Sequence, residues 1–233
     1  AYHSQGRMDE AITAFRTAIR INPNLTQAHH NLGRIYYKQG KLDQAISTFK
    51  TAFNINLANA HLVLGIAYQE QGKLDEAIAE YKTAISVDPN DAQAHNMLGH
   101  AYFMKGQTDE AITAFKTAIS LNPNSAYAHL VLGVVYQRQG KLDEAVAECK
   151  EAININPKLA AAYATLGLVY HTQERLTEAT AEYKTAISID PNNAELYYNL
   201  ACVYSLKNEK NLAIESFQKA ISLNKSWIEH SKT

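Results

Sequence analysis

Four histidines in this sequence recur at a regular interval, and imidazole is a side chain that binds metals and transfers protons near neutral pH. Nine histidines occur among the 233 residues. The regular series is His29, His61, His95 and His129, with spacings of 32, 34 and 34 residues. A metal ion needs each nitrogen at about 2.1 Å, and side chains a whole structural repeat apart cannot meet at one ion. Tyr163 and Tyr197 continue the series, so the position favours a flat, partly polar packing ring over a metal ligand.

The two cysteines also offer little reactive chemistry. Cys149 occupies a position at which other repeats carry Phe or Tyr, so we expect a small buried core residue. We expect Cys202 to be partly exposed. The sequence contains no arrangement of the Ser-His-Asp or Cys-His-Asn kind and no glycine loop of the phosphate-binding kind. We therefore expect no catalytic residue, no cofactor and no metal, and no enzyme within these residues.

Composition excludes several classes of protein. Lys and Arg total 22 against 23 Asp and Glu, so the charge balance gives no electrostatic reason to bind nucleic acid or an anionic membrane. Two cysteines cannot form a disulfide scaffold. No apolar run reaches the length of about 18 residues that a membrane span requires, so we expect no transmembrane segment. These features favour a cytoplasmic, bacterial protein, with membrane association through a partner left open.

The glycines and prolines indicate which structural elements hold these side chains in place. All ten glycines fall into two series, and the members of the first precede a tyrosine by three residues. The first series is Gly33, Gly65, Gly99, Gly133 and Gly167, and the second is Gly6, Gly40, Gly72, Gly106 and Gly140. The five prolines form a third series: Pro23, Pro89, Pro123, Pro157 and Pro191. A period of 34 residues therefore organises the chain.

The repeated motif is Leu-Gly-x-x-Tyr, then Ala-x-x-x-Phe or Tyr, then Pro, as in LGHAY, AITAF and Pro123. With this period the chain resembles the tetratricopeptide-repeat (TPR) family along nearly its whole length. In the family register the repeats span 26–57, 58–91, 92–125, 126–159, 160–193 and 194–227, with a partial repeat at 1–25 and a C-terminal cap at 228–233. The resemblance implies an all-α fold, a right-handed α-solenoid superhelix of antiparallel helix pairs. It also implies a single array over 1–233 with one continuous core.

We expect two antiparallel helices in repeat 92–125, at Ala92–Met104 and Thr108–Ser120. Gly99 is expected where the two helices cross, facing Ala111, because a larger side chain would overpack the crossing by about 1–3 kcal/mol. The second series of glycines, such as Gly106, can adopt a positive φ and end the first helix of each pair.

Two irregularities interrupt the period. The Pro-Asn pair is absent at Asn56-Leu57, either through a true deletion that would tilt the neighbouring repeats or because two residues are missing from the printed chain. The chain also begins at Ala1, within a repeat and without Met, as expected for a fragment or a processed protein.

Two ligand-binding modes of the TPR family are not supported by the residues at the positions that carry them. A carboxylate clamp for peptide C-termini needs Lys, Asn and Arg at five positions over three repeats. The central repeats place Leu62, Ile66, Met97, Tyr127 and Val131 there. An asparagine ladder for peptide backbones needs Asn at the sixth position of each repeat, and only Asn31 and Asn199 provide it.

The family resemblance also implies a ligand-binding concave groove, lined by several positions of each first helix. In this chain those positions give an apolar stripe with four polar residues beside it. The apolar stripe is Leu62, Val63, Ile66, Met97, Phe103, Met104, Leu130, Val131, Val134 and Leu168. The polar residues are Asn31, Arg34, His100 and Arg138. Because first helices such as HLVLGVVY are apolar on both faces, we expect the stripe to be an exposed interaction surface.

We therefore expect a non-catalytic protein–protein interaction module or scaffold that binds an apolar or amphipathic peptide segment of another protein in its concave groove. Two alternatives remain open. The chain could be the regulatory arm of a larger enzyme, or a scaffold whose groove is filled by a second copy in a homo-oligomer. A further possibility is that tight superhelical coiling covers the groove.

Overall fold

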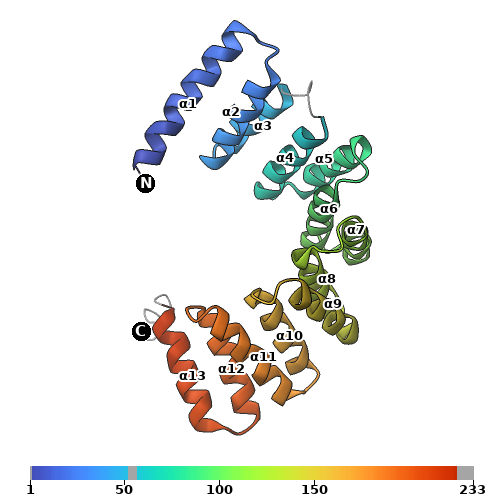
Figure 1. Cartoon of the computed structure of the whole chain (residues 1–233), viewed down its shortest axis with the longest axis vertical. Coiled ribbons are helices and arrows are strands. Elements are labelled where there is room, and N and C mark those ends of the chain that lie inside the picture. The colour runs from blue at the N-terminus through green and yellow to red at the C-terminus, as the bar shows by residue number, and fades with distance from the viewer. Residues whose placement is uncertain (1, 52–56, 225–233) are drawn as a thin grey trace. The chain divides into compact units, whose positions relative to one another are not determined.

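The computed structural model describes residues 2–51 and 57–224. Thirteen helices and no strands occur in these residues (Figure 1), which confirms the all-α fold. The helices are α1 Tyr2–Ile21, α2 Thr26–Lys38, α3 Leu42–Thr51, α4 Leu57–Glu70, α5 Leu74–Val87, α6 Ala92–Met104, α7 Thr108–Leu121, α8 Ala126–Arg138, α9 Leu142–Ile155, α10 Ala160–Thr172, α11 Leu176–Ile189, α12 Ala194–Leu206 and α13 Lys210–Leu223. No helix in the described part of the chain is long and apolar enough to cross a membrane. The expected cap at 228–233 and the shortened joint at Asn56 lie outside the described residues.

The helix pairs form where the period predicts them. In repeat 92–125, α6 has the expected bounds and α7 extends one residue beyond them, to Leu121. The carboxylate of Asp91 accepts hydrogen bonds from the backbone N–H groups of Gln93 and Ala94, at 2.9 and 3.2 Å. These bonds satisfy two of the four N–H groups that a helix start leaves without partners, which fixes where α6 begins.

The chain divides into two compact units, Ala1–Leu121 and Asn122–Thr233. The first unit holds α1–α7 and the second holds α8–α13. Within the units, the first helix of one repeat packs on the first helix of the next: α4 on α6, α8 on α10 and α10 on α12. In the described residues, successive second helices do not pack on each other to the same extent. The first helices of these pairs therefore lie on the inner face of their own unit. The single array with one continuous core stays a prediction.

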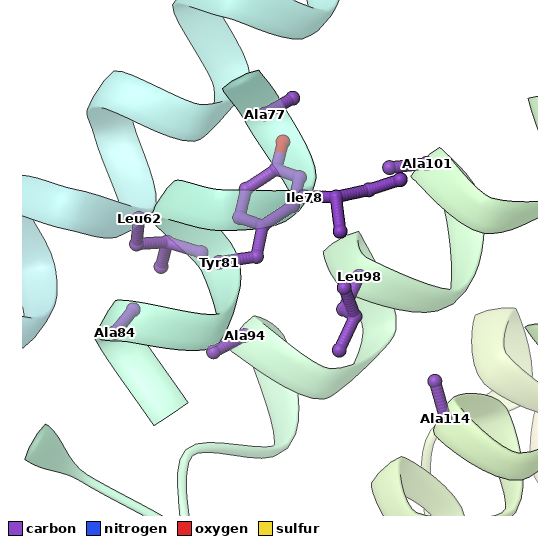
Figure 2. Close-up of a cluster of buried hydrophobic side chains, with 9 residues drawn as sticks. All are labelled: Leu62, Ala77, Ile78, Tyr81, Ala84, Ala94, Leu98, Ala101 and Ala114. Carbon is purple, nitrogen blue, oxygen red and sulfur yellow. The ribbon is translucent and has the colours of Figure 1, made fainter. Parts of the chain in front are cut away.

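The first series of glycines allows an aromatic ring of the second helix to lie against the backbone of the first. A Cβ atom on Gly99 would lie 3.0 Å from the ring of Phe115, a tight contact that would require the ring to shift. The nearest neighbour of Gly99 is therefore the ring of Phe115, four residues beyond Ala111 on α7. That Gly99 also faces Ala111 stays a prediction. Figure 2 shows the equivalent ring of Tyr81 inside a buried cluster with Leu62 and Leu98.

The second series of glycines ends the first helices as expected. Gly106 has a φ of +80°, and Gln107 N–H donates to the carbonyl of Tyr102 at 2.9 Å, which closes the end of α6. This is the left-handed cap for which glycine is preferred. Glu174 and Asn208 occupy the same register position with φ of 60° and 59° although neither is glycine. Gly6 differs, because it lies inside the single helix α1 rather than at a helix end.

Candidate protein-binding site

In the repeats whose preceding turn contains proline, the ring at the fourth position fixes the first helix to that turn. The Nε2 atoms of His95 and His129 lie 3.0 and 3.3 Å from the carbonyl oxygens of Pro89 and Pro123. The hydroxyl of Tyr197 donates to the carbonyl of Pro191 at 3.2 Å. Histidine and tyrosine therefore make the same hydrogen bond, which confirms the prediction of a flat, partly polar packing ring.

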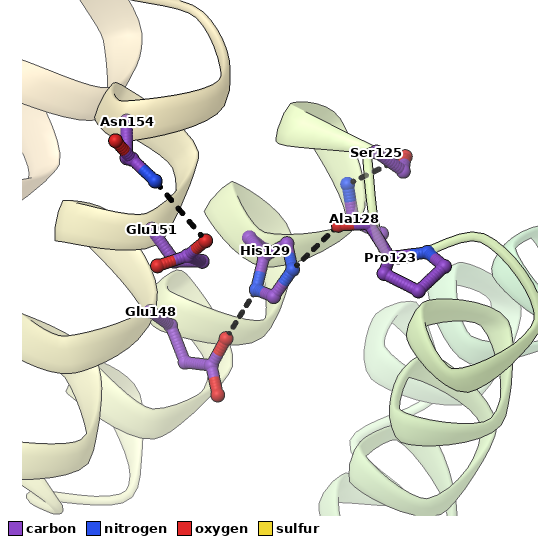
Figure 3. A network of polar contacts seen from close by, with 7 residues as sticks. All are labelled: Pro123, Ser125, Ala128, His129, Glu148, Glu151 and Asn154. Atoms are coloured by element: carbon purple, nitrogen blue, oxygen red, sulfur yellow. Dashed lines mark hydrogen bonds and ion pairs between the residues drawn. The ribbon is translucent and has the colours of Figure 1, made fainter.

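His129 makes a second contact with the other helix of its pair. Its Nδ1 lies 2.7 Å from a carboxylate oxygen of Glu148, as Figure 3 shows together with the contact to Pro123. His61 and Glu80 form the same pair at 2.5 Å. Each histidine thus links two helices of its own repeat. Among residues 2–51 and 57–224, no group of three or more His, Cys, Asp or Glu side chains is placed to hold a metal ion.

Cys149 lies fully within the core, as expected, and Cys202 is partly exposed. Burial, assisted by the nearby carboxylate of Glu148, raises the pKa of the Cys149 thiol to about 12. Because the thiolate is the reactive form, this thiol is a packing group rather than a nucleophile at neutral pH.

Two consecutive side-chain hydrogen bonds connect α5, α4 and α6 of the first unit. The hydroxyl of Tyr81 donates to Oε1 of Gln69 at 3.1 Å, and Nε2 of Gln69 donates to Nδ1 of His100 at 3.0 Å. Burial lowers the pKa of His100 and raises that of Tyr81, so both side chains stay neutral. Beside them, burial and a hydrogen bond to Glu70 raise the pKa of Tyr37 to about 12. His100, expected as a polar contact for a ligand, is thus already engaged within the protein.

The other expected groove residues of the first unit differ widely in exposure. Met104 has 51% of its surface exposed, and Arg34 is exposed as well. The half-buried residues are Asn31, Val63, Ile66, Met97 and Phe103. Leu62 retains only 4% of its surface and belongs to the core cluster around Tyr81. Its burial corrects the expectation that Leu62 is exposed.

In the second unit the same correction applies to Leu130 and Val131, which keep 8% and 9% of their surface. Leu130 packs with Ala152 and Ala162, and Val134 is partly buried against that cluster. Leu168 is 39% exposed, and Arg138 is exposed too. The apolar stripe is therefore not continuous, because the structure uses several of its members as core.

The inner face of the second unit instead contains a cleft between α10 and α12, with a volume of about 300 Å³. Its lining is Ala160, Ala161, Ala164, Thr165, Leu168, Asp190, Asn193, Glu195, Leu196 and Asn199. The cleft combines apolar side chains with amide, hydroxyl and carboxylate groups. Of these residues, sequence reasoning named only Leu168 as part of the site.

The available signal for this cleft was the small residues of α10. At the second and fifth positions of its repeat, α10 has Ala161 and Ala164. Helix α8 has Tyr127 and Leu130 at the same positions. Removal of two large side chains from a helix–helix groove leaves a space that a ligand can occupy.

The chain matches known protein families over most of its length. A family model described as the Cilia and flagella-associated protein 70 C-terminal domain matches residues 54–230. A model described as TPR repeat matches residues 1–40 and 33–72. The chain belongs to the TPR family. No curated protein is a significant match to it in sequence.

Solved TPR structures resemble this fold. A crystal structure of MamA is 29% identical, with a TM-score of 0.65 over 71% of this chain and 97% of MamA. The TPR protein YrrB, described as having an unusual peptide-binding site, is 23% identical, with a TM-score of 0.61 over 79% of this chain and 97% of YrrB. The C-terminal part of a TPR protein from Cytophaga hutchinsonii is 19% identical, with a TM-score of 0.73 over 97% of this chain and 95% of that one. The last two likenesses concern the fold alone.

Proposed function

We propose that this TPR protein is a non-catalytic scaffold that holds an amphipathic peptide segment of another protein in the cleft between α10 and α12. The observation that carries the proposal is the cleft itself, because it lies on the inner face and has both apolar and hydrogen-bonding walls. The presence of a peptide-binding site in YrrB, a protein of the same fold, supports this use of the fold.

The residues of the cleft have complementary tasks. Leu168, which is 39% exposed, offers apolar surface for a side chain of the peptide, together with the small exposed part of Leu196. Within the described residues the side chain of Asn199 makes no hydrogen bond, so its amide is available to donate to and accept from a peptide backbone. The hydroxyl of Thr165 already donates to the carbonyl of Ala161 at 2.9 Å, which leaves its oxygen as an acceptor. An apolar anchor beside backbone-pairing groups is the usual basis of peptide recognition.

The experiment selects peptides from a random phage-displayed library against the purified chain and measures their affinity by fluorescence anisotropy. Leu168→Asp is expected to weaken binding at least tenfold, because it places a charge where an apolar side chain docks. Val87→Asp is the matched control, since Val87 is similarly exposed at 44% but ends the second helix α5. Equal affinities for Leu168→Asp and wild type, with helical circular dichroism unchanged, would refute the proposed site.

A further inference from the structure

A larger cleft, of about 710 Å³, lies in the second unit and is formed by α11, α12 and α13. Its apolar lining comes from Ile187, Tyr197, Leu200, Tyr204 and Leu212. The volume and the aromatic and aliphatic walls are those of sites for small organic ligands. This cleft shares no lining residue with the one between α10 and α12, so it is a separate site.

The sequence explains why this space is open. Leu212 and Ser216 line the cleft, and 34 residues earlier the corresponding side chains are Glu178 and Glu182. Two substitutions in the last repeat therefore replace long carboxylates by a leucine and a short hydroxyl. Both changes remove negative charge, and the second also removes bulk.

An earlier repeat of the same unit shows how a carboxylate can occupy the corresponding space. There Glu148, at the position of Ser216, reaches His129 at 2.7 Å. In the last repeat Tyr197 stands in the place of His129, and its hydroxyl is used on the carbonyl of Pro191. Ser216 is too short to replace the missing carboxylate, so a cleft with an apolar floor remains.

Three charged side chains line the cleft: Lys184, Lys219 and Glu215. The amine of Lys184 lies 5.8 Å from the centre of the Tyr204 ring, and in the described part of the chain neither lysine forms an ion pair. Two amines against one carboxylate favour an anion. The floor residues Ile187, Leu200 and Leu212 offer no side-chain partner for the N–H and C=O groups of an extended peptide. The serine and glutamine side chains of the lining, Ser216, Gln218 and Ser222, all lie on α13, so they can pair with a peptide along one wall only, which disfavours that occupant.

We propose that this larger cleft binds a small amphipathic carboxylate, with an apolar acyl body against Ile187, Tyr197, Leu212 and the small exposed parts of Leu200 and Tyr204, and its head group at the lysines. The apolar body is desolvated by the floor while the carboxylate remains near the amines at the rim. The apolar floor therefore matches the acyl body, and the lysine amines match the carboxylate. The proposal is independent of the peptide site.

Isothermal titration calorimetry of the purified chain with dodecanoate, below its micelle-forming concentration, tests the proposal. One dodecanoate is expected to bind per chain, at least tenfold more tightly than dodecyltrimethylammonium, which has the same chain length and the opposite charge. The double variant Lys184→Gln, Lys219→Gln is expected to lose that preference.

The decisive variant is Leu212→Glu with Ser216→Glu, which restores the residue types that the preceding repeat uses. It is expected to lose dodecanoate binding at least tenfold without loss of helicity. Leu206→Glu is the matched control, because Leu206 is 59% exposed on α12 and does not line the cleft. Absence of binding by wild type, unchanged affinity in the double glutamate variant, or equal affinity for the cation would each overturn the proposal. The proposal would also be overturned if the wild type bound a selected helical peptide but not dodecanoate, and the double glutamate variant lost that peptide binding.

Discussion

Gly65 faces Tyr81 so closely that a Cβ atom on the glycine would lie 2.5 Å from the tyrosine ring. The ring is fully buried, so it cannot move into solvent. We expect Gly65→Ala to lower the free energy of unfolding by about 1–3 kcal/mol through overpacking. Urea denaturation followed by circular dichroism measures this, with Ala79→Ser at an exposed site of α5 as the control. An unchanged urea midpoint for Gly65→Ala would show that α4 and α5 can move apart at this contact without a loss of stability.

Glu174 adopts a φ of 60° at the end of α10, where four earlier repeats have glycine. A side chain in the left-handed region costs about 1–2 kcal/mol. Glycine avoids this cost, but it loses more chain entropy on folding, which offsets part of the gain. Glu174→Gly is therefore expected to stabilise the protein by about 0.5–1 kcal/mol. The converse variant, Gly106→Ala, should destabilise it by a similar amount. Thermal unfolding of both variants checks the sign, and a loss of stability in Glu174→Gly would contradict this reading of the turn.

Tyr81 and Tyr183 occupy the same register position but differ in what their hydroxyls contact. Tyr81 donates to Gln69, whereas the buried hydroxyl of Tyr183 has no hydrogen-bond partner in the described residues. Tyr81→Phe is expected to cost about 0.5–1.5 kcal/mol, and Tyr183→Phe to be neutral or stabilising, since it removes an unsatisfied polar group. Equal losses of unfolding free energy in the two variants would mean that Tyr183 has a partner after all.

The lowered pKa of His100 predicts how stability depends on pH. The unfolded chain takes up a proton near the ordinary histidine pKa of 6.5, whereas folded His100 does so only at lower pH. The folded state thus binds fewer protons in this window, so the contribution is fully present above pH 6.5 and is lost as pH falls. Protonation would also place an N–H against the Gln69 amide that donates to it. Urea unfolding at pH 7.5 and 5.5 should show a smaller pH difference for His100→Gln than for wild type; an identical difference would exclude His100 as the cause.

The repeat register was predictable because many helix ends are encoded locally, by a turn glycine such as Gly106 or by the recurring prolines such as Pro123. The packing of the Phe115 ring on Gly99 was not predicted, since which side chain lies nearest depends on how far one helix is shifted along the other. The exposure of Leu62 and Leu130 was also misjudged. A helix that is apolar all round does not show from its sequence which face its neighbours cover. The cleft beside Leu168 depends on the small residues Ala161 and Ala164 of α10, which indicate an opening only by comparison with the larger residues of α8.

The measurement that tests the central claim most directly is hydrogen–deuterium exchange of the whole chain with and without a library-selected peptide. We expect slower exchange in the parts of α10 and α12 that line the inner cleft, around Leu168 and Asn199. Protection confined to the second helices α11 and α13, or to the unit Ala1–Leu121, would contradict it.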